Sequence, residues 1–303
     1  MQVRVFQVDA FTARRFSGNP AGVVLDAAAL SDPDMQALSR ELGSADTAFV
    51  LPPDGADHDV RVRFLTPRGE AAFIGHATLA VHAVLAALHE PPRPRQKHGD
   101  TIVHVDTIAG ASPPRIAIHQ QVPPPAALLD PQALAAVLDT LALTPAQLDP
   151  RCPPGIAGAG SRRLMLALAE AGALEQLHPD MAQLTRLSAQ LGVAGVFLFT
   201  LHPAVADVFT EARMFCPALG IAEDPVSGNA HALLGAYLWQ YGLIGQERTP
   251  APATLEFTGA QGHHMGRPGR VTVALSLRGS YLESVCIVGE AVVVFATAVE
   301  MNV

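Results

Sequence analysis

The chain has 303 residues, of which 49% are hydrophobic and 16% are charged, so it is long enough for two domains and too apolar to be disordered. Its net charge of −8 comes without a long basic run, which argues against nucleic acid or an anionic membrane as a partner. The three cysteines are widely spaced and match no zinc or disulfide pattern, as is typical of proteins from a reducing compartment.

Neither end of the chain has the pattern of a targeting or membrane segment. The opening residues, MQVRVFQVDAF, alternate like a strand and contain no apolar signal core. The apolar run at 291–299 is too short to span a bilayer, and its β-branched residues predict a buried strand. We therefore expect a cytoplasmic protein.

The first part of the chain predicts several strands and one amphipathic helix. Alternating or apolar segments predict strands over 3–11, 21–25, 47–51 and 59–67. Asp32 as a cap and Pro33 in the first position begin a predicted helix that ends at Gly43. The charged, proline-rich segment 89–100 predicts an exposed loop, and the next two alternating segments, 101–110 and 115–122, predict a hairpin.

The composition then changes to proline and alanine, which indicates a domain boundary. One domain is expected over 1–122 together with a C-terminal strand at 288–303, and the other over 123–287. The second domain repeats the style of the first, with predicted strands over 162–169, 195–201 and 207–217 and an amphipathic helix over 180–192.

The two halves share an order of elements. In each, a capped helix ends in glycine, an apolar strand follows, and a charged, alternating strand then ends in proline. A short loop with a carboxylate comes next, and a glycine with a polar residue opens an apolar helix, in FIGHATLAVHAVL (73–85) and SGNAHALLGAYLWQY (227–241). An internal duplication is the simplest account of this order, with chance similarity of two α/β stretches as the alternative.

Both apolar helices are hydrophobic on nearly all sides, which predicts burial all round. The first amides of a helix lack partners within it, and the helix dipole adds partial positive charge there. Gly75 and Gly228 would let an anion approach this backbone closely. Because neither a P-loop nor a GxGxxG motif occurs, a small organic carboxylate is the expected ligand. The alternative is that the two glycines only permit tight turns.

Three polar residues are candidates for acid–base chemistry. They are His76, which follows Gly75, Asp224, four residues before Gly228, and Asp46, just ahead of a predicted buried strand. A buried carboxylate can have a raised pKa and transfer protons. From the local sequence alone, Asp46 and Asp224 could equally be turn or cap residues.

Five blocks of the sequence resemble the PhzF-like family, named for an isomerase of phenazine biosynthesis. They are VDAFTARRFSGNPAGVVL (8–25), SADTAFVLP (44–52), RFLTPRGEAAFIGHATLAVHAVL (63–85), RMFCPALGIAEDPVSGNAHALLGAYL (213–238) and QGHHMGRPGRVTV (261–273). The resemblance implies a duplicated α+β fold like that of diaminopimelate epimerase. Each half would wrap strands around a central apolar helix, with a ligand cleft between the halves. It also implies an enzyme without a cofactor and a homodimer.

By motif, the resemblance assigns proton transfer to Asp46, with His76 and Asp224 assisting. Gly75, Gly228 and Asn229 would receive the carboxylate of the substrate. The chain departs from the family pattern at Asp46, where Glu is usual, at Ala77, where Pro often stands, and at Asn229, where Ser often stands. Aspartate is one methylene shorter than glutamate, so its carboxylate sits roughly 1–1.5 Å further back, a displacement that can cost ~10²-fold in rate.

Other chemistries fit the sequence less well. The related two-thiol racemases need a cysteine before each helix-opening glycine, and this chain has Ile74 and Ser227 there. The pairs His263 with His264 and His76 with His82 lack ligand spacing, so no metal site is expected. The sequence thus predicts a cofactor-independent isomerase of a small carboxylic acid. The rival interpretation is a weakly active or non-catalytic carboxylate-binding protein that retains the fold.

Overall fold

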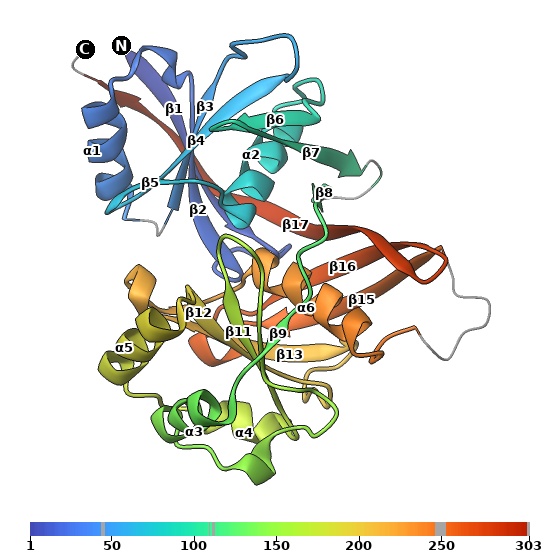
Figure 1. The fold of residues 1–303 in the computed structure, drawn as a ribbon. Helices are drawn as coiled ribbons and strands as arrows, with labels where there is room; N and C mark the ends of the chain where they lie inside the picture. Colours follow the sequence, from blue (N-terminus) through green and yellow to red (C-terminus); the bar gives the residue numbers. More distant parts are fainter. Residues whose placement is uncertain (44–45, 109, 111–112, 246–252, 302–303) are drawn as a thin grey trace. The chain divides into compact units, whose positions relative to one another are not determined.

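The structure is a computed structural model that describes residues 1–43, 46–108, 110, 113–245 and 253–301. The chain divides into two compact units, an N-terminal unit of Met1–Gln120 with Val288–Val303 and a C-terminal unit of Gln121–Ile287 (Figure 1). The boundary predicted from composition lay at residues 122 and 123. Among the described residues, no helix combines the length and apolar character that crossing a membrane requires.

The N-terminal unit contains one run of paired strands, two α-helices and a 3-10 turn. The strand that ends in this unit, β17, starts in the other one. The elements are β1 (Gln2–Ala10), β2 (Asn19–Leu25), η1 (Ala27–Ala29), α1 (Asp32–Leu42), β3 (Asp46–Leu51), β4 (Val60–Thr66), β5 (Gly69–Ala71), α2 (Gly75–Ala87), β6 (Arg95–His98), β7 (Thr101–Ile108), β8 (Arg115–Gln120) and β17 (Tyr281–Glu300).

The C-terminal unit has the remaining elements. They are β9 (Ala127–Leu128), α3 (Pro131–Thr140), η2 (Pro145–Gln147), β10 (Gly155–Ala157), β11 (Arg163–Leu168), α4 (Ala171–Glu175), α5 (Met181–Leu191), β12 (Gly195–Thr200), β13 (Thr210–Cys216), η3 (Pro217–Leu219), β14 (Ile221–Asp224), α6 (Gly228–Gln240), β15 (Thr254–Gln261), η4 (His263–Met265) and β16 (Gly269–Arg278).

Strand pairing shows that the two units repeat one topology. In the N-terminal unit, β1–β2 is antiparallel, β2–β3 parallel, β3–β4 and β4–β5 antiparallel, β4–β6 parallel and β6–β7 antiparallel. The C-terminal unit repeats this series of directions pair by pair: β10–β11 is antiparallel, β11–β12 parallel, β12–β13 and β13–β14 antiparallel, β13–β15 parallel and β15–β16 antiparallel. The internal duplication predicted from the order of elements is therefore present in the hydrogen-bond ladders.

Each unit surrounds one apolar helix with strands. Helix α2 packs against β1, β2, β3, β7 and β8, and all of its residues from His76 to Leu85 are buried (Figure 1). Helix α6 packs against β11 and β16 and buries nine of its residues. A helix that is apolar on every side needs partners on every side, which a curved sheet provides.

The amphipathic helices α1 and α5 are built by matching local signals. Helix α1 has its N-cap at Ser31, whose side chain accepts from the Asp34 amide, so the prediction of an Asp32 cap was wrong by one residue. Gly43 ends the helix at φ 63°, a left-handed conformation that suits glycine. Helix α5 likewise has Asp180 as its N-cap and ends at Gly192 with φ 62°. Each helix buries a narrow apolar stripe against its unit.

Two sequence predictions about exposure were wrong. Segment 89–100 contains β6, a strand that buries Gln96 and His98. Segment 291–299 forms a strand that pairs with β1, but Phe295 is 50% exposed and its next three neighbours are exposed too. Composition gave the wrong burial in both places, because strand pairing and contacts with distant segments decide which side chains are covered.

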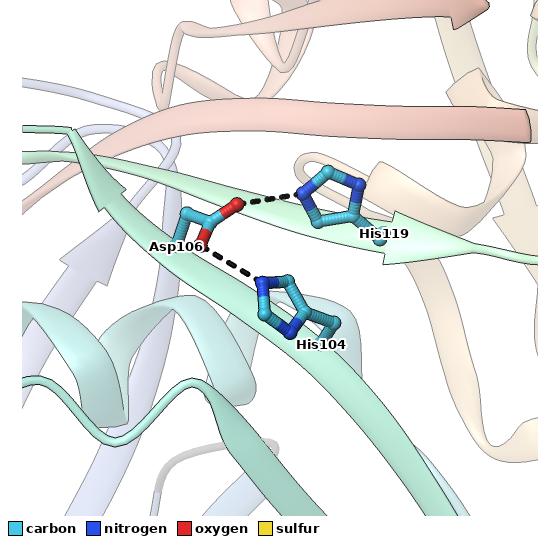
Figure 2. A group of neighbouring side chains, drawn as sticks. All are labelled: His104, Asp106 and His119. Atoms are coloured by element: carbon cyan, nitrogen blue, oxygen red, sulfur yellow. Dashed lines mark hydrogen bonds and ion pairs between the residues drawn. The ribbon is translucent and has the colours of Figure 1, made fainter.

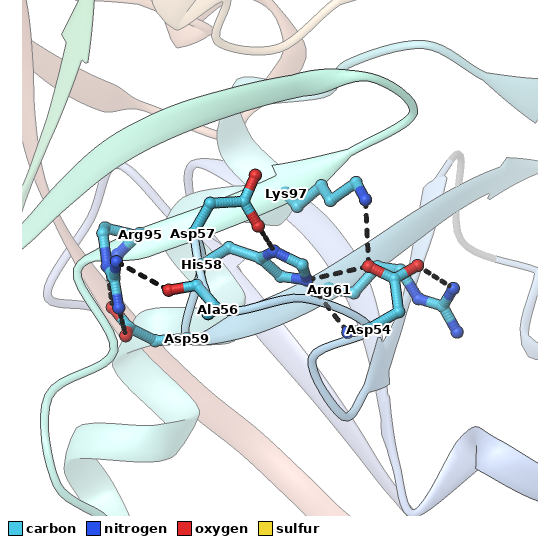
Figure 3. Close-up of polar contacts among 8 residues, drawn as sticks. All are labelled: Asp54, Ala56, Asp57, His58, Asp59, Arg61, Arg95 and Lys97. Carbon is cyan, nitrogen blue, oxygen red and sulfur yellow. Dashed lines mark hydrogen bonds and ion pairs between the residues drawn. The ribbon is translucent and has the colours of Figure 1, made fainter.

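An ionic network fastens β6 to the loop between β3 and β4 (Figure 3). Arg95 Nη2 donates to Asp59 Oδ1 at 2.6 Å, and Lys97 Nζ donates to Asp54 Oδ1 at 2.9 Å. The buried ring of His58 lies between the carboxylates of Asp54 and Asp57, with its Nε2 3.0 Å from Asp54 Oδ1. These contacts explain how so charged a segment joins the sheet: its cations meet carboxylates of the adjacent loop.

Candidate active site

Asp46 is a buried carboxylate at the start of β3. All six residues of this strand are buried, and Asp46 is paired with Ala21 of the parallel partner strand β2. The side chain of Asp46 is only 9% exposed. Burial raises the pKa of the Asp46 carboxyl from 3.8 to about 6, because the charged form loses its hydration. A carboxyl with such a pKa is able to accept and return a proton near neutral pH.

His76 faces this carboxylate from the first turn of α2. Its Nε2 lies 3.3 Å from Asp46 Oδ2, and its side chain is 10% exposed. Helix α2 has Ile74 as its N-cap, which provides no side-chain hydrogen bond to the first amides. The partial positive charge of the helix start therefore lies at Gly75 and His76, beside the carboxylate. The structure thus places a buried carboxylate, an imidazole and a helix start without a side-chain cap together in one unit.

A second polar cluster fixes α2 further along its length. His82 Nε2 lies 3.1 Å from Gln96 Oε1, and Gln96 Nε2 donates to Thr78 Oγ1 at 3.1 Å. Burial lowers the pKa of His82 to about 4, so the ring is neutral and its Nε2–H donates to Gln96. Because Gln96 belongs to β6, this cluster ties the helix to its sheet. His82 is therefore a core residue.

In the C-terminal unit, Gln261 holds the loop that carries Asp224. Asp224 is the last residue of β14 and is half-buried. Gln261 Nε2 donates to the carbonyl of Asp224 at 2.6 Å, and Gln261 Oε1 accepts from the amide of Ser227 at 3.1 Å. One side chain thus fixes both ends of the segment between the strand and α6. The role of Gln261 was not predicted from the sequence, because a polar residue at the end of a strand carries no local signal of this function.

The start of α6 differs from that of α2. Ser227 Oγ accepts from the amide of Ala230 at 3.3 Å, so a side chain caps this helix. The ring of His231 is fully buried, with Nδ1 2.8 Å from the Ser227 carbonyl, and burial lowers its pKa to about 4. Gly228 is buried and Asn229 is half-buried. At α6 one of the first amides therefore already has a side-chain partner, whereas the N-cap of α2 provides none.

Arg163, at the start of β11, is a buried cation that was not predicted from the sequence. It is 6% exposed, and its Nη1 donates to Ser161 Oγ at 2.7 Å. Its Nε has no hydrogen-bond partner among the residues that the structure describes. Burial lowers the pKa of this guanidinium, and the charges of Cys216 and Asp224 act in the opposite direction. A basic residue opening an apolar strand is the signal that could have identified it.

The structure thus brings the predicted residues together in two groups. Asp46, Gly75 and His76 form one group in the N-terminal unit, and Asp224, Gly228 and Asn229 lie within six residues of one another in the C-terminal unit. That the two groups share one cleft stays a prediction. Among the described residues, the side chains that could together hold a metal ion are His104, Asp106 and His119, none of which belongs to either group.

Comparison with known proteins identifies relatives over almost the whole chain. The model of the PhzC-PhzF family, described as phenazine biosynthesis-like protein, matches residues 8–297. The uncharacterized isomerase YddE of Salmonella typhimurium is 37% identical over 304 residues, covering 97% of each chain. An uncharacterized isomerase of Clostridium acetobutylicum is 33% identical and covers 98% of each chain.

Solved structures agree with these relatives. A PhzF-family phenazine biosynthesis protein of Bacillus anthracis matches with a TM-score of 0.86 and 25% identity, covering 99% of this chain and 100% of that one. A hydroxyproline epimerase of Agrobacterium vitis, covering 98% of this chain and 92% of that one, matches with a TM-score of 0.59 and 13% identity, which shows the epimerase-like α+β fold alone. The expected fold class and enzyme class are therefore confirmed, and the chain belongs to the PhzF-like isomerase family.

Proposed function

We propose that this isomerase moves a carbon-bound proton on a small carboxylic acid, without a cofactor. The observation that supports the proposal most directly is the buried Asp46 carboxyl, with a pKa of about 6, lying 3.3 Å from His76 Nε2. Removal of a proton from carbon needs a base that is ionised at working pH yet able to release the proton again. A carboxylate with a raised pKa meets both requirements better than an ordinary surface aspartate.

In the proposed mechanism, Asp46 takes the proton from one carbon of the substrate and returns it to another. His76 lies close enough to orient the Asp46 carboxylate and to balance its charge. Asp224 assists from the C-terminal unit. The uncapped start of α2 at Gly75 binds the substrate carboxylate through backbone amides. Gly228 and Asn229 provide further contacts, and a site shielded from water favours proton transfer from carbon.

The C-terminal unit also contains a buried positive charge, at Arg163. Burial lowers the pKa of the Arg163 guanidinium, an effect that the charges of Cys216 and Asp224 oppose, and its Nε has no partner among the described residues. An unpartnered N–H on a buried cation is a strong donor for a carboxylate. We therefore include Arg163 among the residues that bind the acid, together with Gly228 and Asn229.

Deuterium exchange tests this function. The full-length protein is incubated in D₂O with a panel of cyclic and acyclic carboxylic acids, and loss of carbon-bound hydrogen is followed by NMR. We expect exchange with at least one acid, abolition of that exchange in Asp46→Asn, and nearly unchanged binding of the acid by the variant. Asp26→Asn is the matched control, because Asp26 is an exposed carboxylate of the same unit that pairs with Arg4.

The outcomes separate the enzyme from its rival. Binding of an acid with no exchange in the unmodified protein would support the non-catalytic carboxylate-binding interpretation, whose motive is that Asp46 replaces the family's usual glutamate. Exchange that persists in Asp46→Asn would show that another group is the base. Asp46→Glu moves the carboxylate by roughly 1–1.5 Å, and we expect the exchange rate to fall by up to ~10²-fold if the site is fitted to aspartate.

A further inference from the structure

Three side chains with metal-binding atoms gather on one exposed face of the β7–β8 hairpin (Figure 2). His104 and Asp106 are two residues apart in β7, so they point to the same face of the sheet. His119 lies in β8, where Val105 is paired with Ile118, so that the antiparallel register puts His104 opposite His119. The hairpin was predicted from the sequence, but this juxtaposition depends on its register and was not.

The three side chains already converge. Nε2 of His104 lies 2.9 Å from Asp106 Oδ1, and Nε2 of His119 lies 2.8 Å from Asp106 Oδ2 (Figure 2). The two imidazole rings are 5.2 Å apart between centroids, and the ligand atoms of all three residues lie within 4.8 Å of one another. The Asp106 carboxylate thus joins the two rings, with one oxygen facing each imidazole.

We propose that His104, Asp106 and His119 form a binding site for a divalent transition metal, of which Zn²⁺ is the representative ion. Two imidazole nitrogens and one carboxylate oxygen are a ligand set that suits zinc, copper or nickel and does not suit calcium or magnesium. With metal–ligand bonds of about 2.0–2.2 Å, neighbouring ligand atoms of a tetrahedral ion lie about 3.3 Å apart. The three ligand atoms now lie within 4.8 Å of one another, and rotation of the exposed side chains can adjust their spacing to that value.

The site is open rather than closed. The three side chains are between 41% and 52% exposed, so an ion can enter without opening the fold. Three protein ligands leave at least one coordination position for water or another small ligand. Metal binding replaces the hydrogen bonds that now join the imidazoles to Asp106, and the ion then links β7 to β8 directly. None of the three residues belongs to the proposed proton-transfer machinery, so the site is an addition to that function.

Calorimetry with ZnCl₂ on the metal-free, full-length protein tests the proposal. We expect one equivalent of Zn²⁺ to bind, with MgCl₂ giving no binding under the same conditions. Replacing one ligand in His104→Gln or His119→Gln is expected to weaken Zn²⁺ binding by at least about tenfold. The control is the double variant His263→Gln with His264→Gln, which removes two consecutive histidines outside the proposed site. We expect it to bind Zn²⁺ as tightly as the original chain.

Cobalt provides an independent readout of the ligands. Co²⁺ substituted for Zn²⁺ should give visible absorption bands that are lost in His104→Gln and altered in Asp106→Asn. Thermal unfolding of the metal-free variants serves as the folding check, and exposed substitutions should leave the midpoint nearly unchanged. The proposal is overturned if the protein binds no Zn²⁺, if His104→Gln and His119→Gln bind it as tightly as the original chain, or if the control variant loses the binding.

Discussion

Replacing Asp46 with Asn should remove activity and, at neutral pH, make the protein more stable. Burial raises the pKa of Asp46 from 3.8 to about 6, so the folded state holds this proton more tightly than the unfolded state does. The free energy of unfolding therefore falls as the pH rises from about 4 through 6. At neutral pH, the whole pKa difference corresponds to roughly 3 kcal/mol. Asparagine has nearly the same shape but never ionises, so the variant is free of this cost.

Urea unfolding of both proteins at pH 5 and pH 7.5 measures the effect. Roughly half of the cost, about 1.4 kcal/mol, develops between these two values, because Asp46 in the folded state ionises mainly within that window. The stability of Asp46→Asn relative to the original chain should therefore grow by about that amount from pH 5 to pH 7.5. The sign of the effect is fixed: the difference in free energy of unfolding between Asp46→Asn and the original chain must increase as the pH rises.

Asp149→Asn is a control of opposite sign. Asp149 is also buried, but its hydrogen bond from Arg151 is the main cause of a lowered pKa, so its ionised form stabilises the folded state. This variant should be less stable than the original chain at both pH values, with no gain toward pH 7.5. If the difference in free energy of unfolding between Asp46→Asn and the original chain stays constant or shrinks as the pH rises, Asp46 does not have a raised pKa. Its proposed role as a base that works near neutral pH is then refuted.

Three further predictions follow from the same structure. The value of kcat/KM for the proton-transfer reaction should rise with pH through about 6, because only ionised Asp46 accepts a proton; a profile that is flat between pH 5 and pH 7 would contradict this role. Gly259→Ala should lower the free energy of unfolding by about 1–3 kcal/mol, since a Cβ there would lie 2.5 Å from the buried ring of His231; an unchanged urea midpoint would show that the ring moves aside. Glu223 accepts two hydrogen bonds of 2.8 Å from Arg213. Arg213→Met would leave this carboxylate without its cation and should lower the free energy of unfolding by about 3 kcal/mol. Glu223→Gln should lower it by less in the same urea assay.

Several features of this protein could be determined from the sequence alone. Capping residues, terminal glycines and apolar periodicity predicted α1, α5 and the two central helices, because these signals act within a few residues of chain. The shared order of elements predicted the duplication, and family motifs pointed to Asp46, His76 and Asp224. All of these features depend on local backbone chemistry or on motifs that are contiguous in the chain.

Only the tertiary structure decided how separate segments meet. The 3.3 Å approach of His76 to Asp46 joins residues thirty positions apart, and the raised pKa of Asp46 results from burial by its neighbours. The same holds for Gln261, which fixes the Asp224 loop from another strand, and for the cross-strand pairing of His104 with His119. Dehydration and strand register are properties of the packed sheet, since they depend on which atoms exclude water from a side chain and which residues lie opposite it.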